Sequence, residues 1–173
     1  MRKTIFILSL IVFCFLELRS LIKINSSVQK LVENTNNECV IPENYEKTYL
    51  RIYSGAFSNK TIFHVFNSFF DKTPNKCPCM EMAKFTVKNN SKITALNITN
   101  TLVTALFLEF QISQKECHRY LLNHYNFDKK IIGACDASRQ YFIKSFDQLT
   151  TNEYLQIIVM MKNIGLYLSL IHI

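Results

Sequence analysis

Glycine and proline are scarce in this chain, and this scarcity limits the folds that it can adopt. Three of each occur among 173 residues, while 49% of the residues are apolar. β-Sandwiches and β-barrels need many turns, and turns depend on these two residues. Disordered and collagen-like chains contain far more of them. The composition therefore favours an all-α fold in one compact domain.

The first twenty residues are arranged like a secretory signal peptide. Arg2 and Lys3 come before a long apolar run, and the small residue Ser20 follows it. The run is shorter than a segment that spans a bilayer, which weighs against a membrane anchor. The sequence predicts a signal peptide at residues 1–20, a single domain at residues 21–173 and a secreted, extracellular protein.

Four Asn-X-Ser/Thr triplets agree with export. In secreted proteins this motif accepts N-linked glycan and marks positions at the surface. The predicted glycosylation sites are Asn25, Asn59, Asn89 and Asn97.

The cysteine spacing predicts two disulfides and one spare thiol. Removal of the leader leaves an odd number of cysteines, which is unusual for an exported domain. Neighbours separated by a single proline are too constrained to pair with each other. We expect one bond between Cys39 and Cys117 and a second from either Cys77 or Cys79 to Cys135.

The same cysteines could instead hold zinc together with His118 and His124, or act as a redox pair. Structural zinc sites are typically built from C-x-x-C and H-x-x-x-H units, which this chain lacks. The Cys77-Pro78-Cys79 segment also lacks the two-residue spacer of thiol oxidoreductases. We therefore predict neither a metal site nor a cofactor.

Apolar residues at helical spacing predict two helices in the first half of the chain. One helix is expected between Pro42 and Ser58 and another over residues 62–70. Aromatic stripes of this kind usually face a core. The stripe of the first helix is Tyr45, Tyr49, Ile52 and Ala56, and that of the second is Ile62, Phe63, Phe66, Phe69 and Phe70.

The middle of the chain is less uniform. Residues 80–88 alternate in polarity and fit either a short strand or a helix. Residues 98–117 predict one long amphipathic helix, and residues 120–132 a loop or a short helix. The apolar face expected for the long helix consists of Ile98, Leu102, Leu106 and Phe110, widened by Val103 and Phe107.

The last third predicts two more helices. The first follows Cys135, with Asp136 or Ser138 as its cap, and turns Phe142, Phe146 and Leu149 inward.

A capping box then precedes a long apolar helix over residues 154–171. Thr150 and Glu153 have the spacing of that motif. Lys162 lies inside the apolar run and would be costly at the centre of a bilayer, so we expect the helix in the middle of a bundle. A membrane-retained protein is the alternative.

Catalytic chemistry is not predicted. None of His64, His118, His124 and His172 stands in a nucleophile motif, and no Gly-rich phosphate loop exists. Glu81 is expected on a solvated helix face. The chain is therefore predicted not to be an enzyme.

Basic residues outnumber acidic ones and give a net charge of +7. Lys84, Lys88 and Lys92 would form a stripe on a helix, but the other basic residues are dispersed. Dispersed charge does not favour nucleic acid and is typical of a solvated face. In an exported protein, weak binding to glycosaminoglycan is the alternative.

Two stretches of the chain resemble the interleukin-10 family of helical cytokines. Residues 117–121, Cys-His-Arg-Tyr-Leu, are similar to the end of that family's fourth helix. Residues 135–149 are similar to the Cys-led fifth helix of the interleukin-19 and interleukin-20 branch. The residues that carry the motifs are His118, Arg119, Phe146, Asp147 and Leu149.

The cysteine order agrees with this resemblance, and the last helix departs from it. Cys77-Pro78-Cys79 is similar to the cysteines that open the family's third helix, and Cys39 to its N-terminal cysteine. Residues 160–164, however, lack the family's acidic signature.

The resemblance implies a disulfide-pinned bundle of about six helices, of the class II helical cytokine type. It implies a cytokine, or a mimic of one, that binds class II cytokine receptor ectodomains and triggers receptor-kinase signalling. A monomer is expected, with a dimer that exchanges helices as the alternative. The competing function is a secreted helical carrier of an apolar ligand, which the many Phe and Ile residues would suit.

Overall fold

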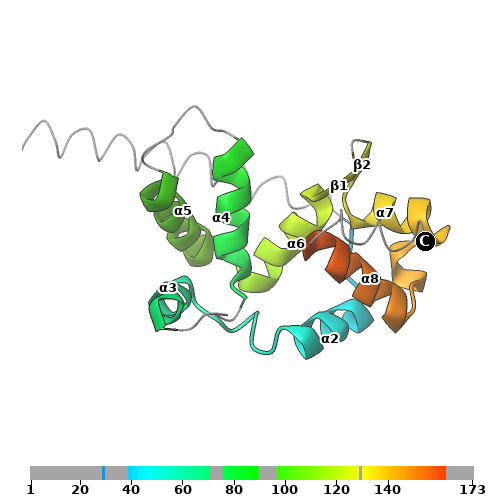
Figure 1. Ribbon diagram of the computed structural model, residues 1–173, viewed down its shortest axis with the longest axis horizontal. Helices are drawn as coiled ribbons and strands as arrows, with labels where there is room; N and C mark the ends of the chain where they lie inside the picture. Colours follow the sequence, from blue (N-terminus) through cyan, green and yellow to red (C-terminus); the bar gives the residue numbers. More distant parts are fainter. Residues whose placement is uncertain (1–28, 30–38, 71–75, 90–96, 129, 163–173) are drawn as a thin grey trace, which may run out of the picture.

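The computed structural model describes residues 29, 39–70, 76–89, 97–128 and 130–162 (Figure 1). Helices dominate these residues, so the prediction of a helical, disulfide-pinned fold is confirmed. In chain order the elements are α2 (Glu43–Ile52), α3 (Thr61–Phe70), α4 (Pro78–Asn89), α5 (Asn97–Gln111), α6 (Gln114–His124), β1 (Asn126–Asp128), β2 (Ile131–Ile132), α7 (Ala134–Phe142), η2 (Phe146–Gln148) and α8 (Thr151–Lys162).

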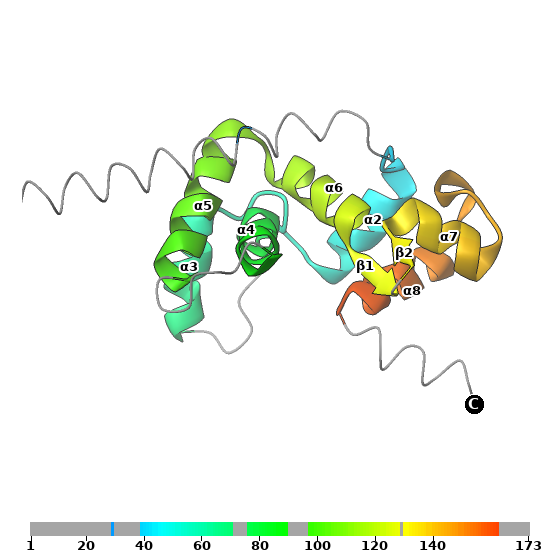
Figure 2. The ribbon, with the colours of Figure 1, turned by 90° about the horizontal axis from the view of Figure 1, so that it is seen from above.

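Helix α6 joins two groups of elements, as Figures 1 and 2 show from two directions. Helices α3, α4 and α5 lie at one end, where α4 packs against both α5 and α6. The antiparallel hairpin, α2, α7, η2 and α8 lie at the other end, where α2 packs against α8. We call the first group the cysteine lobe and the second the aromatic lobe, after the residues in their cores.

Aromatic rings fill the core of the aromatic lobe. The ring of Tyr45 lies 5.3 Å from that of Phe146 and 5.5 Å from that of Tyr154, centroid to centroid. Such tilted and edge-to-face pairs stabilise a core beyond their buried area. The predicted inward positions of Phe146 and Leu149 are confirmed, whereas Ile52 is 43% exposed.

Small and sulfur-containing side chains fill the core of the cysteine lobe. Ala83 of α4 and Ala105 of α5 are fully buried, and short side chains let two helices approach closely. The remaining buried members of this cluster are Cys77, Cys79, Met80, Met82, Leu108, Cys117, Tyr120 and Leu121.

Each lobe contains one disulfide, and the predicted pairing is wrong. The bonds are Cys39–Cys135 in the aromatic lobe and Cys79–Cys117 between α4 and α6. Cys117 lies near the start of α6 and faces α4, whereas Cys39 lies near the end of α6, where its carbonyl accepts a hydrogen bond from Asn123. The predicted spare thiol is confirmed and belongs to Cys77, which is buried.

Four of the five residues in the aromatic stripe of α3 face solvent, so their predicted place in the core is wrong; the side chain of the fifth, Phe69, lies outside what the structure describes. Ile62, Phe63, Phe66 and Phe70 are 60%, 59%, 62% and 76% exposed. Helix α3 instead buries Thr61 and packs Val65 against the cysteine-lobe core. Periodicity identified an apolar face correctly, but contacts with α5, such as the hydrogen bond from the Thr61 N–H to the Glu109 carboxylate, decide which side of α3 meets the core.

The long helix predicted over residues 98–117 is two helices, α5 and α6. Ser113 begins α6 with a capping box, because its hydroxyl accepts from the Glu116 N–H and the Glu116 carboxylate accepts from the Ser113 N–H. The buried face of α5 agrees with the predicted one in part, because Leu102 and Phe107 pack against the cysteine-lobe core. Phe110 is 91% exposed, while Leu108 is fully buried.

The remaining local predictions have mixed outcomes. Residues 80–88 are helical, within α4. Residues 120–132 end α6 and then form the hairpin, which was not predicted. Gly133, with φ of 86°, precedes α7 in place of the predicted side-chain cap.

Helix α8 begins as predicted and lies in the core of the aromatic lobe. The Glu153 carboxylate accepts from the Thr150 N–H at 2.7 Å, which confirms the capping box. Tyr154 and Ile157 are fully buried, as expected for a central helix. Within the described residues no helix has the length and apolarity that crossing a membrane requires. The end of the predicted helix, residues 163–171, lies outside the described residues, as does the leader.

Candidate functional site

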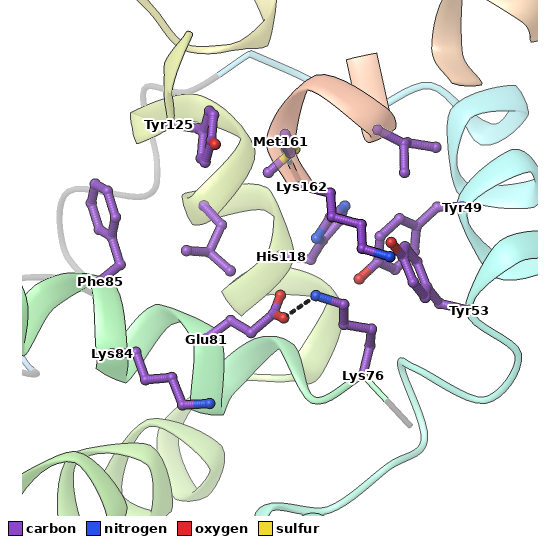
Figure 3. A pocket seen from close by; sticks show the side chains of 12 residues that line it. Tyr49, Tyr53, Lys76, Glu81, Lys84, Phe85, His118, Tyr125, Met161 and Lys162 are labelled. Carbon is purple, nitrogen blue, oxygen red and sulfur yellow. Dashed lines mark hydrogen bonds and ion pairs between the residues drawn. The ribbon is translucent and has the colours of Figure 1, made fainter. Parts of the chain in front are cut away.

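A hollow with a volume of about 290 Å³ lies where the two lobes meet along α6 (Figure 3). Ligand pockets often occupy such junctions and combine an apolar wall with a few polar groups. The side chains that line it are Tyr49, Tyr53, Lys76, Glu81, Lys84, Phe85, His118, Leu121, Tyr125, Ile158, Met161 and Lys162.

Helix α4 supplies a carboxylate, an amine and a ring to one side of the hollow. Glu81, Lys84 and Phe85 are three and four positions apart, so they share one face of the helix.

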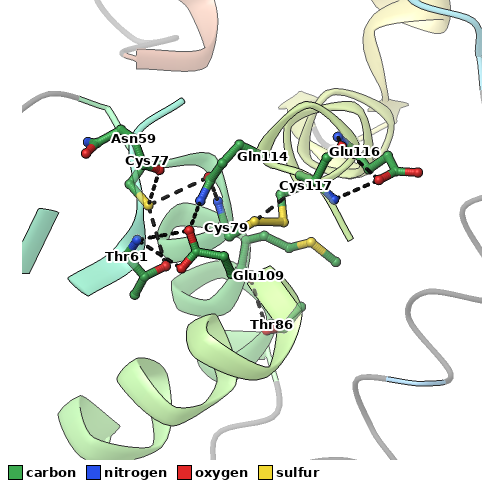
Figure 4. Close-up of a disulfide and its surroundings, with 11 residues drawn as sticks. Asn59, Thr61, Cys77, Cys79, Thr86, Glu109, Gln114, Glu116 and Cys117 are labelled. Atoms are coloured by element: carbon green, nitrogen blue, oxygen red, sulfur yellow. Dashed lines mark hydrogen bonds between the residues drawn. A yellow bond between two sulfur atoms is a disulfide. The ribbon is translucent and has the colours of Figure 1, made fainter. Parts of the chain in front are cut away.

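The start of α4 is held firmly against α6 (Figure 4). The Cys79–Cys117 disulfide joins the two helices, and the Cys79 N–H donates to the Gln114 side-chain oxygen at 2.9 Å. Both constraints act within one turn of Glu81. They therefore fix its carboxylate relative to the α6 side of the hollow.

Charge in the hollow is mainly positive. Lys76 and Glu81 form an ion pair, and the Lys76 amine also lies 5.4 Å from the centroid of the Tyr53 ring, within cation–π range (Figure 3). Lys84 and Lys162 are exposed. Three amines against one carboxylate give the hollow a surplus of positive charge, which suits an anionic group on a ligand.

His118 contributes an uncharged imidazole at the inner wall. The side chain is 2% exposed, and burial together with the nearby Lys76 charge lowers its pKa to about 3. Its Nε2 lies 3.0 Å from the Tyr45 hydroxyl, and its ring lies 4.0 Å from that of Tyr49. His118 is therefore neutral near pH 7 and joins the hollow to the aromatic core.

Two tyrosines add phenol groups that stay protonated. Burial raises the pKa of Tyr49 far above its ordinary value, and burial also raises the pKa of Tyr125. The Tyr125 hydroxyl donates to the carbonyl of Met160 at 3.5 Å, so α8 holds that ring in place.

The structure brings one of the predicted motif residues into the hollow. His118 lines it, while Arg119 is half-buried on α6 and Asp147 is exposed on η2. Phe146 and Leu149 are core residues of the aromatic lobe.

The predicted glycosylation sites are spread over the chain. Asn59 donates its side-chain amide to the carbonyl of Lys76 at 3.2 Å. Asn89 is the last residue of α4 and Asn97 is the first of α5. Asn25 lies outside the described residues.

The buried thiol of Cys77 lies behind the start of α4, close to the hydroxyl of Thr61 and the side-chain oxygen of Gln114 (Figure 4). Burial raises the pKa of this thiol. The group is therefore kept as a thiol, which suits a packing role.

Sequence reasoning missed the charged groups of the hollow. Glu81 was expected on a solvated face, but it is two-thirds buried beside Lys76. The available signal was the grouping of Glu81, Lys84 and Phe85 on one face. Nothing local to α4 indicates that Tyr53 and Lys162 lie opposite that face.

A second hollow lies beside the start of α6, and its polar groups mostly pair with one another. Glu46 and Lys115 form an ion pair at 2.6 Å, and Glu116 belongs to the α6 capping box. These groups have structural partners, whereas Lys84 and Lys162 stand exposed at the first hollow. The first hollow is thus the better candidate site.

Comparison with known proteins gives one match. A family model described as Transglycosylase matches residues 79–171, which is more than half of the chain. This range contains nine of the twelve residues that line the hollow, all except Tyr49, Tyr53 and Lys76. No curated protein and no solved structure matches the chain.

This match overturns the predicted function. A cytokine that binds class II receptor ectodomains and signals through receptor kinases is wrong for this chain, as is the prediction that it is not an enzyme. The predictions of a carrier of an apolar ligand and of weak binding to glycosaminoglycan are wrong for the same reason. Two short motif likenesses at residues 117–121 and 135–149 supported it, and the match extends over both of them.

Proposed function

Because the chain belongs to the transglycosylase family, we propose that it transfers a glycosyl group between carbohydrate substrates bound in the hollow between the lobes. The observation that carries this proposal is the meeting of one carboxylate, three amines and several aromatic rings in a single hollow. Nine of the twelve residues that line the hollow lie in the range that the family model matches.

Glu81 is the group that would act as the general base. In glycosyl transfer a hydroxyl of the acceptor sugar attacks the anomeric carbon of the donor. A new C–O bond forms there, the bond to the leaving group breaks with its electron pair, and the acceptor proton passes to a base. Among the residues that line the hollow, Glu81 is the single carboxylate.

The amines Lys76, Lys84 and Lys162 define the donor that this arrangement suits. A donor whose leaving group is already a stable anion, such as a diphosphate, needs positive charge beside that group and no proton. One carboxylate and three amines meet those two needs. A neutral sugar leaving group would instead require a second carboxyl group as acid.

The aromatic side chains would hold the sugars. Tyr53, Phe85 and Tyr125 offer ring faces and edges with limited rotational freedom, which suits the apolar faces of pyranose rings. His118, being neutral, adds hydrogen-bonding capacity without adding charge to the hollow.

Substitution of Glu81 tests the proposal most directly. Glu81→Gln keeps the shape of the side chain and removes the base, so we expect the rate of transfer to fall by about 10²- to 10⁴-fold. The assay would use a fluorescent disaccharide carried on a diphosphate, with the elongated product separated by electrophoresis.

Glu43→Gln is the matched control, because Glu43 is an exposed glutamate paired with Lys47 on the outside of α2. It should leave the rate unchanged. Thermal unfolding of both variants separates a catalytic loss from a loss of structure. Transfer by Glu81→Gln at the rate of the unsubstituted protein would rule out Glu81 as the base.

We also propose that the protein is exported. The apolar leader and the two disulfides, Cys39–Cys135 and Cys79–Cys117, support an oxidising compartment. The likeness of residues 117–121 and 135–149 to the class II helical cytokine type stays a prediction about the arrangement of the helices. It does not include receptor binding.

A further inference from the structure

One ring nitrogen of His118 is buried at the inner wall of the hollow and has no hydrogen-bond partner among the described residues. The side chain is 2% exposed, and Nδ1 is the nitrogen concerned. Buried polar atoms normally have a partner, because an unpaired one costs free energy. Since His118 also lines the hollow, a bound molecule can supply that partner (Figure 3).

The other ring nitrogen, Nε2, is paired with Tyr45 of α2. Tyr45 is fully buried, and its hydroxyl oxygen lies 3.0 Å from Nε2. Tyr45 does not belong to the side chains that line the hollow. Nδ1 lies across the imidazole ring from Nε2, so the unpaired nitrogen is on the side of the ring that is turned away from Tyr45.

The pairing with Tyr45 decides which nitrogen carries the proton. A neutral imidazole has one N–H group and one acceptor nitrogen, whereas a phenol hydroxyl can donate or accept. If Nε2 carried the proton, the Tyr45 hydrogen would have no acceptor in the part of the chain that the structure describes. Two buried groups would then be unpaired instead of one. The Tyr45 hydroxyl therefore donates to Nε2, and the proton of His118 is on Nδ1.

The imidazole ring is held in one orientation. The ring of Tyr49 lies 4.0 Å from it and that of Phe57 lies 5.7 Å from it, centroid to centroid. Rotation of the imidazole would also break the bond to Tyr45. The Nδ1–H group therefore has a defined direction, as a group that selects a ligand needs.

The inner wall of the hollow suits an uncharged partner for this group. Leu121 and Ile158 line the hollow together with His118, and both are apolar. The amines of Lys84 and Lys162 are exposed, so an anionic group on the ligand has its counter-charges nearer to solvent. Burial among apolar side chains costs a neutral oxygen far less than an anionic one.

We propose that the Nδ1–H group of His118 donates a hydrogen bond to an uncharged hydroxyl or carbonyl oxygen of the carbohydrate in the hollow. His118 is then a specificity-determining residue, because a ligand without an acceptor at that position leaves the N–H group buried and unpaired. The identity of the ligand as a carbohydrate rests on the proposed function. The place of the proton on Nδ1 does not depend on it.

NMR of the full chain, with histidine labelled with nitrogen-15, measures the tautomer. Nδ1 of His118 should resonate as a protonated ring nitrogen and Nε2 as an unprotonated one. Tyr45→Phe removes the donor to Nε2 and should give a mixture of both tautomers. Tyr49→Phe is the matched control, because it removes a hydroxyl from a ring that packs on His118 without bonding to it. A proton on Nε2 in the unsubstituted protein would overturn the proposal.

Calorimetric titration with two probes tests the hydrogen bond to the ligand. The probes are a free disaccharide and inorganic diphosphate. His118→Gln can place its amide where Nε2 lies and keep the pairing with Tyr45, but it has no donor where Nδ1 lies. We expect it to bind the disaccharide about tenfold more weakly, as loss of one hydrogen bond predicts, and to bind diphosphate unchanged.

His118→Asn is the matched variant, because its shorter amide reaches the position of Nδ1 and not that of Nε2. It should bind the disaccharide nearly as well as the unsubstituted protein, although its Tm falls because Tyr45 loses its partner. If His118 had a packing role alone, binding would follow Tm in both variants, and that result would overturn the proposal.

Two further results separate this inference from the proposed function. An equal loss of disaccharide and diphosphate binding in His118→Gln would overturn the inference, because the partner of Nδ1–H would then be charged. Disaccharide binding that depends on His118 in a protein without transfer activity would support the inference and contradict the proposed function alone.

Discussion

The two lobes place the same class of residue on opposite sides of their helices. In the aromatic lobe, Tyr45, Tyr49 and Tyr154 are buried. In the cysteine lobe, Phe63 and Phe66 face outward while Ala83 and Ala105 are buried. Both lobes are rich in rings, so hydrophobicity alone does not decide which residues are inside.

Available volume explains the difference. Ala83 of α4 and Ala105 of α5 are fully buried, a disulfide joins α4 to α6, and α3 meets this core through the short side chains of Thr61 and Val65. In the aromatic lobe the rings themselves fill the space between the elements, and the tyrosine hydroxyl groups are hydrogen-bonded. The Tyr154 hydroxyl donates to the Phe146 carbonyl at 2.8 Å, and the Tyr45 hydroxyl bonds to His118.

Removal of the disulfides should have the largest effects on the free energy of unfolding, and the two bonds should differ in how much they contribute. The loops closed by Cys39–Cys135 and Cys79–Cys117 have sequence separations of 96 and 38. The chain-entropy relation gives about 5 kcal/mol for the first bond and about 4 kcal/mol for the second. We expect paired Cys→Ser variants to lower the free energy of unfolding in that order, measured by urea denaturation.

The hollow distinguishes these variants further. Loss of Cys79–Cys117 should also weaken glycosyl transfer, because this bond holds the start of α4 near Glu81. Loss of Cys39–Cys135 should leave transfer intact at temperatures where the variant is folded. Equal loss of transfer in both variants would show that the lobes do not act separately.

Truncation within the aromatic core comes next. Tyr154→Ala removes a fully buried ring, and we expect a loss of about 3 to 5 kcal/mol in the free energy of unfolding. Tyr154→Phe keeps the ring but leaves the Phe146 carbonyl without its donor, which should cost about 1 to 3 kcal/mol. A Phe variant as unstable as the Ala variant would contradict the idea that the ring acts as a spacer.

Local signals in the sequence predicted local structure well. The Thr150 and Glu153 pair marked the start of α8, because a capping box depends on residues only three positions apart. The same motif at Ser113 and Glu116 marks the start of α6. It therefore indicates two helices where the sequence analysis predicted one helix over residues 98–117. Contacts between distant residues were not accessible in this way.

The hollow and the disulfide pairing illustrate what the sequence does not specify locally. Tyr53, Glu81, His118 and Lys162 come from four separate segments, and only the packing of both lobes on α6 brings them together. The α3 stripe shows the same limit. Its period of 3.6 identified an apolar face, but the direction in which that face points depends on the contacts of α3 with the distant helix α5, such as the hydrogen bond from Thr61 to Glu109.

Overpacking the cysteine lobe should have a smaller effect than truncating the aromatic core. Ala105→Leu adds bulk at a fully buried position on α5, and we expect a loss of about 1 to 3 kcal/mol in the free energy of unfolding. Leu106→Met, at the neighbouring 37% exposed position, is the control and should be close to neutral. Tolerance of Ala105→Leu would mean that α4 and α5 are not limited by volume.

The two capping boxes should give the smallest effects, and these should depend on pH. Hydrogen bonds from Lys144 and Thr150 lower the pKa of Glu153 from 4.5 to about 2, and bonds from Ser113 lower the pKa of Glu116. A carboxyl group whose pKa is lower in the folded state stabilises the fold above pH 4.5, and that stabilisation is lost as the pH falls through the folded-state pKa. Glu153→Gln should therefore flatten the dependence of Tm on pH between about 4.5 and 2.

Lys144→Gln tests whether the two capping boxes titrate independently, because Lys144 bonds to Glu153 at 2.7 Å. It should raise the pKa of Glu153, followed by NMR of the carboxyl carbon, and leave that of Glu116 unchanged. If both pKa values moved together, the starts of α6 and α8 would be coupled through the core, and the lobes would not be electrostatically independent.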